Sequence, residues 1–534
     1  MSESKVIKGI LILFLFWLLL NIPYMHLREF QGEEGKRVII AENMLKTGEW
    51  IVPAVETVPY LRKPPLYNWI LAGGFWITGT VSETTARIPS AVSAFLSALC
   101  LSLFWRSAAK IKDLWFILPG LIFLTFTDVM DKAIRAEIDM TFTMFITLAL
   151  FLWFHLHEVR QKQTLAWVSA LSLLSIATLA KGVQAPAFFY CGMIPYLIYR
   201  KEMKRIFSIS HLLGILAALV IFFAWFVPFA DRIGVERVLQ TWWHEIAIRK
   251  EPIRAGGFFR HLLEFPVQYI AAYMPWIPFA LLWTHKSLRE RATEYQKIVL
   301  YCLFFLLFSI PFYWILPGAR LRYIMPVSGA LALLLTVPVH IWMQGDLVKH
   351  PWANRYVRAL GFLLIGVVLS SPFWGTEFGL FKRAVPVFLL GAVFFLSVSL
   401  VFAGKNIKKL IVLLLLAVLS VKISWASLYF PYHAEHLSHY RTAAREINML
   451  VPPGVHLYDF NVDNPHLAYY LNRPVTLIKL FDKATMKNSA VIYMRRKDAE
   501  RLDLRGLSYI GEVKARRDFL SLYKVVNRER SHED

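Results

Sequence analysis

The chain has 534 residues, of which 57% are hydrophobic, and its mean hydropathy is +0.48. These values exclude an ordinary soluble domain and indicate a polytopic membrane protein. The formal net charge is +22, but the Lys and Arg residues are scattered along the chain. This distribution argues against nucleic-acid binding and is typical of basic cytoplasmic loops that contact anionic membrane lipids.

Apolar segments recur along most of the chain. A membrane-spanning helix needs about 20 mostly apolar residues, and on this rule the sequence predicts an all-α polytopic fold with about 13 transmembrane helices. The segment 66–79 is apolar but short, so we expect an interfacial or re-entrant helix there. The predicted spanning helices are centred near residues 16, 95, 121, 148, 172, 190, 218, 275, 307, 333, 366, 392 and 418.

The charges of the connecting loops predict the orientation of these helices. Short basic clusters lie at residues 5–8, 106–112, 200–205 and 405–409, and they fall at alternate ends of the predicted helices. Because basic loops stay in the cytoplasm, these loops and the N-terminus are predicted to be cytoplasmic. The first long loop, residues 26–83, then lies outside the plasma (inner) membrane.

The C-terminal part of the chain changes character. We predict a transmembrane domain over residues 1–428 and a small α/β domain over residues 429–534. In the second part, short apolar runs such as Val455–Phe460, Val475–Ile478 and Val491–Met494 alternate with charged helical stretches. With an odd number of spanning helices, this domain is expected to be extracytoplasmic.

Carboxylates stand at two places on the predicted outer face. Glu33 and Glu34 follow the first predicted helix, and acids beside hydrocarbon cost free energy unless they are solvated, paired or functional. A carboxylate there can take a proton from an acceptor hydroxyl or amine. The alternative is that both acids begin a helix over residues 35–46. Asp139 stands at the start of a later predicted membrane helix. An acid there is either part of a functional site or a helix cap.

Cations on the predicted outer face oppose the positive-inside trend and therefore call for a reason. Lys63 precedes two prolines that hold it in an extended segment, where a fixed ammonium suits a lipid phosphate. Lys181, Arg320 and Arg322 are further candidates for anion binding. The alternatives are snorkelling for Lys63 and plain exposure for the others.

No cofactor is named with certainty by the sequence. The three cysteines are spaced too widely for a metal motif, and no His or Cys spacing indicates zinc. The set of Glu and Asp residues could instead bind a divalent cation through oxygen ligands.

Seven short motifs follow one another between residues 33 and 326. They read Glu33-Glu34-x-Lys36, Ala41-Glu42-Asn-Met44-Leu45-x-x-Gly48-Glu49-Trp50-x-x-Pro53, Lys63-Pro64-Pro65, Ala86-Arg87-Ile-Pro89-Ser90, Ile138-Asp139-Met, Leu179-Ala-Lys181-Gly182 and Arg320-Leu-Arg-Tyr-Ile-Met-Pro326. Their order resembles the GT-C membrane glycosyltransferases, and among them the bacterial aminoarabinose (lipid A) transferases and protein mannosyltransferases. The motifs cover roughly residues 5–330, and beyond them only the overall layout is similar.

This resemblance implies an inverting sugar transfer outside the membrane. The acceptor would attack the anomeric carbon of a sugar carried on a polyprenyl phosphate, and the lipid phosphate would leave. By position in the motifs, Glu33 would activate or orient the acceptor, Glu34 would assist, and Asp139 would be the second acid of the site. Lys63 would hold the carrier phosphate, and Lys36 stands where the family has an Arg.

Three positions depart from the family pattern. Glu33 is usually Asp, Lys36 is usually Arg, and Arg62 replaces an acid that precedes Lys-Pro in many relatives. The longer carboxylate and the missing bidentate guanidinium alter the expected geometry, and Arg62 removes a carboxylate that a metal would use. A more cationic site would suit an acidic sugar such as a uronic acid.

We therefore predict a glycosyltransferase that moves a sugar from a polyprenyl-phosphate donor to an acceptor in the cell envelope. Lipid A is the acceptor that we favour. Other lipids, glycans or, as in a protein O-mannosyltransferase, protein hydroxyls are alternative acceptors. A transporter or flippase would need ionisable residues at mid-membrane and inverted repeats, and the sequence shows neither. The predicted ligands of the donor phosphate are Lys36, Lys63, Lys181, Arg320 and Arg322.

Overall fold

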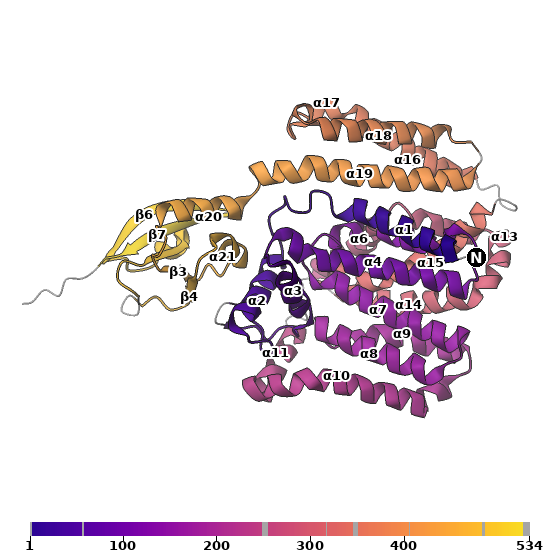
Figure 1. Cartoon of the computed structure of the whole chain (residues 1–534), viewed down its shortest axis with the longest axis horizontal. Coiled ribbons are helices and arrows are strands. Elements are labelled where there is room, and N and C mark those ends of the chain that lie inside the picture. The colour runs from indigo at the N-terminus through magenta and orange to yellow at the C-terminus, as the bar shows by residue number, and fades with distance from the viewer. Residues whose placement is uncertain are drawn as a thin grey trace, which may run out of the picture.

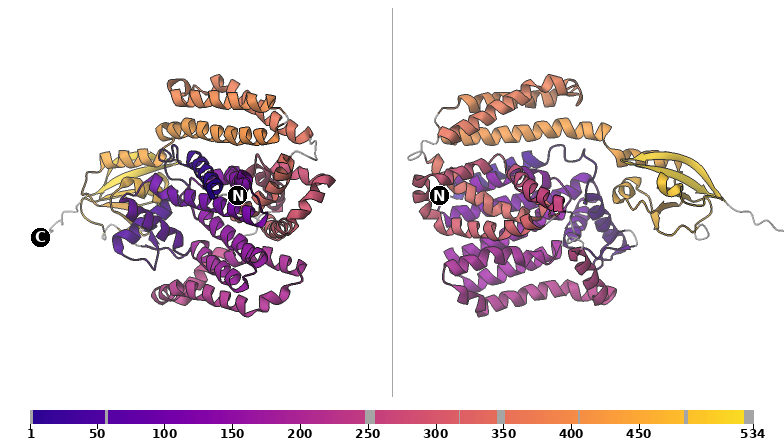
Figure 2. Two further views of the ribbon diagram at one scale, coloured as in Figure 1. Left: turned by 45° about the vertical axis from the view of Figure 1, so that its right-hand side comes forward. Right: turned by 180° about the vertical axis from the view of Figure 1, so that it is seen from behind.

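The computed structural model describes residues 3–55, 58–247, 255–316, 318–344, 351–404, 406–482 and 486–526. It consists mainly of helices that pack side by side, with a small β-sheet region at one end (Figure 1). Views from two further directions show the same arrangement, with the sheet region next to α2 and α3 (Figure 2). The predicted combination of a helical membrane part and a small C-terminal sheet region is therefore confirmed.

Many of the helices are long and apolar enough to cross a membrane. Within the described residues there are nine of them, and up to ten if one bent pair of helices is counted as a single span. This confirms a multi-pass membrane protein. The nine contain α4 (Glu83–Ala108), α7 (Ile138–Phe154), α8 (Gln163–Lys181), α10 (Ile209–Ile233), α14 (Gln296–Ile315), α15 (Ser328–Met343), α16 (Pro351–Leu369), α18 (Ala384–Phe402) and α19 (Ile407–His436).

The other four predicted spanning helices fall outside these nine. They correspond to α1 (Glu3–Asn21), the short apolar helix Leu114–Leu124 that contains α5 (Leu118–Leu124), α9 (Gln184–Tyr199), and α12 (Ala255–Ala272) with the turn Ile277–Thr284 that follows it. The last pair is bent by 96° at its break. The number 13 therefore stays a prediction.

Shorter helices connect or flank these elements. They are α6 (Thr127–Lys132), α11 (Val235–Ala247), α13 (Lys286–Arg291) and α17 (Ser371–Trp374).

The first long loop, residues 26–83, folds into two short helices and a hairpin. Helix α2 (Glu34–Thr47) and helix α3 (Leu66–Thr78) confirm the two helices predicted there. Both end at a glycine in the left-handed conformation, Gly48 at φ 71° and Gly79 at φ 66°. The hairpin between them pairs β1 (Ala54–Val55) with β2 (Val58–Pro59).

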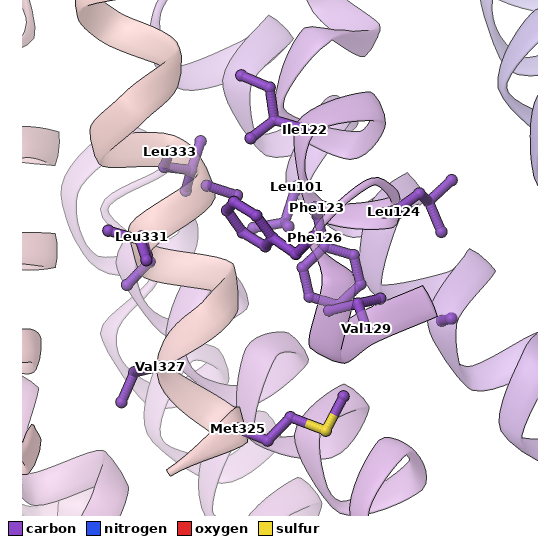
Figure 3. Packing of buried hydrophobic residues seen from close by; sticks show 14 of the residues in the cluster. Leu101, Ile122, Phe123, Leu124, Phe126, Val129, Met325, Val327, Leu331 and Leu333 are labelled. Carbon is purple, nitrogen blue, oxygen red and sulfur yellow. The ribbon is translucent and has the colours of Figure 1, made fainter. Parts of the chain in front are cut away.

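The core of the helical part is a continuous apolar cluster. Side chains from α4, α5, α6 and α15 meet in it, among them Leu101, Phe123, Val129 and Leu331, all nearly or fully buried (Figure 3). Helix α4 begins with a capping box in which Ser82 and Thr85 bond each other's backbone N–H. The capping box fixes where α4 begins.

The C-terminal sheet has five strands in the order β4-β3-β5-β7-β6. Strand β3 is parallel to both β4 and β5, and β7 is antiparallel to β5 and β6. Three of the strands were predicted, whereas β6 and β7 were not. The predicted boundary at 428/429 lies inside α19. The elements are α20 (His439–Leu450), β3 (Leu457–Phe460), α21 (Pro465–Leu471), β4 (Val475–Ile478), β5 (Val491–Arg495), α22 (Arg496–Ala499), β6 (Leu507–Ala515) and β7 (Asp518–Val525).

Candidate active site

One cavity gathers most of the residues predicted for the site. It has a volume of about 160 Å³ and is walled by α2, residues 60–63, the start of α7, the end of α8 and the turn Leu321–Tyr323. We call it the charged cavity. Its lining is Glu33, Lys36, Arg37, Tyr60, Arg62, Lys63, Glu137, Ile138, Asp139, Lys181, Gln184, Arg322 and Tyr323. Six of the eight predicted residues are thus brought together from distant parts of the chain.

Glu33 presents its carboxylate to this cavity. It occupies the N-cap position of α2, and its side chain is 40% exposed. The nearest cations are Lys36 Nζ at 3.8 Å and Arg37 Nη2 at 3.9 Å from its Oε2. These distances are longer than hydrogen bonds, so the cations orient the carboxylate while leaving its oxygens able to accept a proton.

Asp139 is held differently, in a close ion pair with Lys181. Asp139 lies in the first turn of α7 and Lys181 at the end of α8, and Lys181 Nζ donates to Asp139 Oδ1 over 2.6 Å. Both side chains are less than a tenth exposed. Lys181 Nζ also lies 4.9 Å from the ring centre of Phe142 and 5.6 Å from that of Tyr323. Asp139 therefore fixes the position of an ammonium group in the wall of the cavity.

Glu137 is a third acid of the cavity, and it was not predicted. Lys132 Nζ donates to Glu137 Oε2 over 2.8 Å, and Arg322 Nη1 lies 3.8 Å from the same oxygen. Burial by itself lowers the pKa of Arg322, but Asp139 and Glu137 outweigh that effect and raise it. Two acids thus hold Arg322 as a permanent cation at the cavity wall. Glu137 stands two residues before Asp139 in the sequence, and this spacing was the signal that could have indicated a place in the same site.

Arg37 is the second residue that the prediction missed. Its side chain is only 3% exposed, and its Nη2 donates to the Tyr60 hydroxyl over 3.2 Å. Its Nε and Nη1 are buried without a hydrogen-bond partner among the described residues. Arg37 also lines the charged cavity, and a guanidinium with unused donors beside a cavity is suited to bind an anionic group. The spacing of four residues from Glu33 on one helix would have indicated that both share a face.

Glu34 and Arg320 lie outside the charged cavity. Glu34 is fully buried, and it accepts hydrogen bonds from Arg87 at 2.8 and 3.1 Å and from the Ala136 N–H at 2.9 Å. Burial alone would raise the pKa of Glu34, but Arg87 outweighs it and holds the pKa at about 2. In this geometry Glu34 joins α2 to α4, and its assisting role stays a prediction. Arg320 is exposed and is not part of the lining.

A second cavity adjoins the first and is apolar on one side. Its volume is about 140 Å³, and it shares four polar side chains, Arg62, Lys63, Lys181 and Gln184, with the charged cavity. Phe222, Trp242 and Val183 form its apolar wall. The two cavities together offer fixed cations next to apolar surface.

The predicted divalent-cation site does not take shape at these acids. Among the residues that the structure describes, the group of His and Glu side chains close enough to share an ion is His157, Glu158 and Glu202. These three lie outside the charged cavity, and Glu158 is already paired with Arg200 and Lys297. These three residues therefore form an ion-pair cluster with Arg200 and Lys297.

A family profile and a solved structure show what the chain is similar to. The profile of the dolichyl-phosphate-mannose-protein mannosyltransferase family matches residues 62–228. The structure is similar to a crystal structure of ArnT from Cupriavidus metallidurans bound to undecaprenyl phosphate, with a TM-score of 0.71 over 98% of this chain and 99% of that one. Because the identity is 19%, this likeness establishes the fold.

Two relatives are similar to this chain in amino-acid sequence over most of its length. The chain is 27% identical to an undecaprenyl phosphate-α-4-amino-4-deoxy-L-arabinose arabinosyl transferase of Proteus mirabilis, covering 70% of this chain and 68% of that protein. It is 26% identical to an uncharacterized protein of Aquifex aeolicus, over 88% of this chain and 87% of that one. The resemblance to the aminoarabinose transferases and protein mannosyltransferases, predicted from the motifs, is confirmed.

Proposed function

We propose that the chain is an inverting glycosyltransferase that moves a sugar from a polyprenyl phosphate to lipid A outside the inner membrane. The enzyme class is the part that the relatives support directly, since they are named as transferases with an undecaprenyl-phosphate-linked sugar donor. The observation that carries the proposal for this chain is the charged cavity. It joins a carboxylate, a set of cations and an apolar wall at one place.

The donor phosphate would lie where the two cavities share their walls. Lys63, Arg62 and Lys181 face both cavities there, and the polyprenyl chain would leave past Phe222 and Trp242. When the bond between the sugar and the phosphate breaks, negative charge builds on the phosphate oxygen. Fixed cations beside that oxygen stabilise the transition state more than they stabilise the bound donor.

The acceptor would be activated by Glu33. Among the three acids of the cavity, its ion pairs are the longest, whereas Asp139 and Glu137 each accept a charged hydrogen bond shorter than 3 Å. The Glu33 carboxylate takes the acceptor proton as the acceptor oxygen attacks the anomeric carbon from the face opposite the phosphate. Asp139 and Glu137 keep Lys181 and Arg322 in position for the departing lipid phosphate.

The number of membrane spans and their orientation can be proposed from the apolar helices and the charges of the loops. The nine spanning helices together with α1, α9, the helix Leu114–Leu124 and the bent pair around α12 would give 13 spans. With the basic loops in the cytoplasm, the first outer loop and the sheet region after α19 lie outside. We propose residues 1–436 as the membrane part and residues 439–526 as the extracytoplasmic domain, moving the boundary to the end of α19.

The test is a transfer assay with purified protein in detergent, read by mass spectrometry. Polyprenyl-phosphate sugars, including 4-amino-4-deoxy-L-arabinose, mannose and a uronic acid, are combined with lipid A, other envelope lipids or envelope protein. We expect a new sugar mass on lipid A, and Lys63→Met should slow its appearance about 100-fold. The matched control Arg320→Ala, an exposed cation outside the cavity, should stay within about twofold of wild type. Equal losses in both variants would overturn the phosphate assignment.

A protein O-mannosyltransferase is the second candidate, because the matching family profile carries that activity in its name. The two candidates differ in the acceptor. A mannose mass on added protein with none on lipid A would replace the first proposal by the second. Transfer to neither acceptor from any donor would contradict both and favour a transporter.

A further inference from the structure

The segment that leads into α2 makes several hydrogen bonds with the C-terminal domain. Glu29 accepts hydrogen bonds from the first backbone N–H groups of α20, those of His439 and Tyr440 at 3.1 Å each. The Phe30 N–H donates to the Tyr470 hydroxyl over 2.8 Å. The carboxylate of the first outer loop therefore caps a helix of the C-terminal domain, and the two parts are joined by paired polar groups.

The contacts continue through the next residues along the chain. Gln31 Nε2 lies 2.8 Å from the Nε2 atom of His433, at the end of α19. The Gly32 carbonyl oxygen lies 3.1 Å from the Nε2 atom of His466, in α21 of the C-terminal domain. Because a carbonyl oxygen only accepts hydrogen bonds, His466 Nε2 must carry the proton. In the run from Glu29 to Glu34, Glu33 is the residue whose side chain faces the charged cavity.

His466 is wedged against the first turn of α2. A Cβ added to Gly35 would lie 2.5 Å from His466 Nδ1, closer than any real contact. Gly32 has φ +63°, and a Cβ there would lie 2.9 Å from Glu137 Oε1. The backbone around Glu33 thus lies close to a histidine of the C-terminal domain and to an acid of the cavity, and a side chain at Gly35 would require His466 to move.

We propose that the C-terminal domain positions the catalytic carboxylate, and that His466 is the positioning residue. This inference rests on the proposed role of Glu33. His466 touches neither cavity, so it acts through the Gly32–Glu33 peptide. Its hydrogen bond fixes where α2 begins and hence the direction in which the Glu33 side chain points.

Rate is expected to depend strongly on this contact. A reacting group displaced by about 1 Å can lose about 100-fold in rate, because attack requires a narrow range of distance and direction. Binding of the donor involves cations on other elements, namely Lys63 and Lys181, which the His466 contact does not hold. Loss of the contact should therefore lower kcat and leave KM for the donor almost unchanged.

Two substitutions of His466 separate the hydrogen bond from the rest of the side chain. A Gln side chain places an amide N–H near the position of Nε2, whereas an Asn side chain reaches only the position of Nδ1. We expect His466→Gln to keep the rate within about threefold, and His466→Asn to lower kcat about 10- to 100-fold. Arg505→Ala, on the same domain with a side chain that is 88% exposed, is the matched control and should behave as wild type.

A double-mutant cycle with Glu33→Gln shows whether His466 acts through Glu33. If it does, His466→Asn has little further effect once the carboxylate is gone, so the two losses do not multiply. Multiplying losses, an equal loss in His466→Gln, or a raised KM with unchanged kcat would overturn the inference. If Glu33→Gln alone is fully active, the proposed function of Glu33 fails instead, which keeps the two failures distinct.

Discussion

The buried pair of Glu34 and Arg87 gives the sharpest prediction about stability. Arg87 is 1% exposed, and it donates to both carboxylate oxygens of Glu34 and to the carbonyl oxygens of Met25 and Arg28. The substitution Arg87→Met keeps the volume but leaves a fully buried carboxylate without its partner. Breaking such a pair costs about 3–5 kcal/mol, because the remaining charge stays desolvated.

The pKa of Glu34 gives a second route to the magnitude. Its value of about 2, against 4.5 for an ordinary Glu, corresponds to about 3 kcal/mol at about 1.4 kcal/mol per unit. Since the folded pKa lies below the unfolded one, this stability is fully present above about pH 4.5 and is lost as the pH falls toward 2. The two figures are similar in size, so we expect the substitution Arg87→Met to lower the free energy of unfolding by about 3 kcal/mol at pH 7.

The assay is thermal unfolding in detergent, followed by tryptophan fluorescence. At pH 7, Arg87→Met should melt well below wild type, and adding Glu34→Gln should restore part of the loss. Without Arg87, burial raises the pKa of Glu34, so the difference between the single and the double variant should shrink as the pH falls. An Arg87→Met variant that melts like wild type, or losses that simply add in the double variant, would refute the pairing.

Three further substitutions test the charged cavity and the contact of His466 with α2. Asp139→Asn should lower both the melting temperature and the transfer rate measured by mass spectrometry, because the buried Lys181 ammonium loses its partner. Adding Lys181→Met should restore the melting temperature but not the transfer rate. Arg37→Gln should weaken donor binding about tenfold with little change in melting temperature, since two buried N–H groups of Arg37 bond nothing in the described chain; unchanged donor binding by titration would contradict this. Gly35→Ala should lower kcat as His466→Asn does, because the added Cβ would displace the His466 imidazole. Gly73→Ala is the control and should leave kcat unchanged, since nothing lies within 4 Å of the added Cβ. Equal kcat values for the two variants would contradict this prediction.

Six of the residues that line the charged cavity could be predicted from the sequence. Lys63, Asp139 and Lys181 stood out because charges at the outer ends of membrane helices are costly without a purpose. Glu33 and Glu34 could not be separated in this way. Successive residues at the start of a helix point about 100° apart, so one faces the cavity and the other faces α4, and no local pattern indicates which. Arg320 and Arg322 presented the same ambiguity on a short turn.

The remaining features depend on contacts across long stretches of chain. The bonds from Glu29 to α20 join residues about 410 positions apart, and no local pattern reports them. Strands β6 and β7 were missed because polar, glycine and charged residues interrupt their apolar positions, whereas β3 and β5 are buried at nearly every position. Arg37 and Glu137 were overlooked although each stands close to a predicted residue, because only the fold shows which neighbours share the cavity.

The most direct test of the central claim compares Glu33→Gln with wild type in transfer from an undecaprenyl-phosphate-linked sugar to lipid A. Initial rates are measured by mass spectrometry on protein that melts at the wild-type temperature. We predict that wild type adds one sugar mass to lipid A and that Glu33→Gln is slower by about 100- to 10,000-fold, as expected for loss of a general base. Equal rates for the two proteins would contradict the account of the charged cavity as the site of sugar transfer.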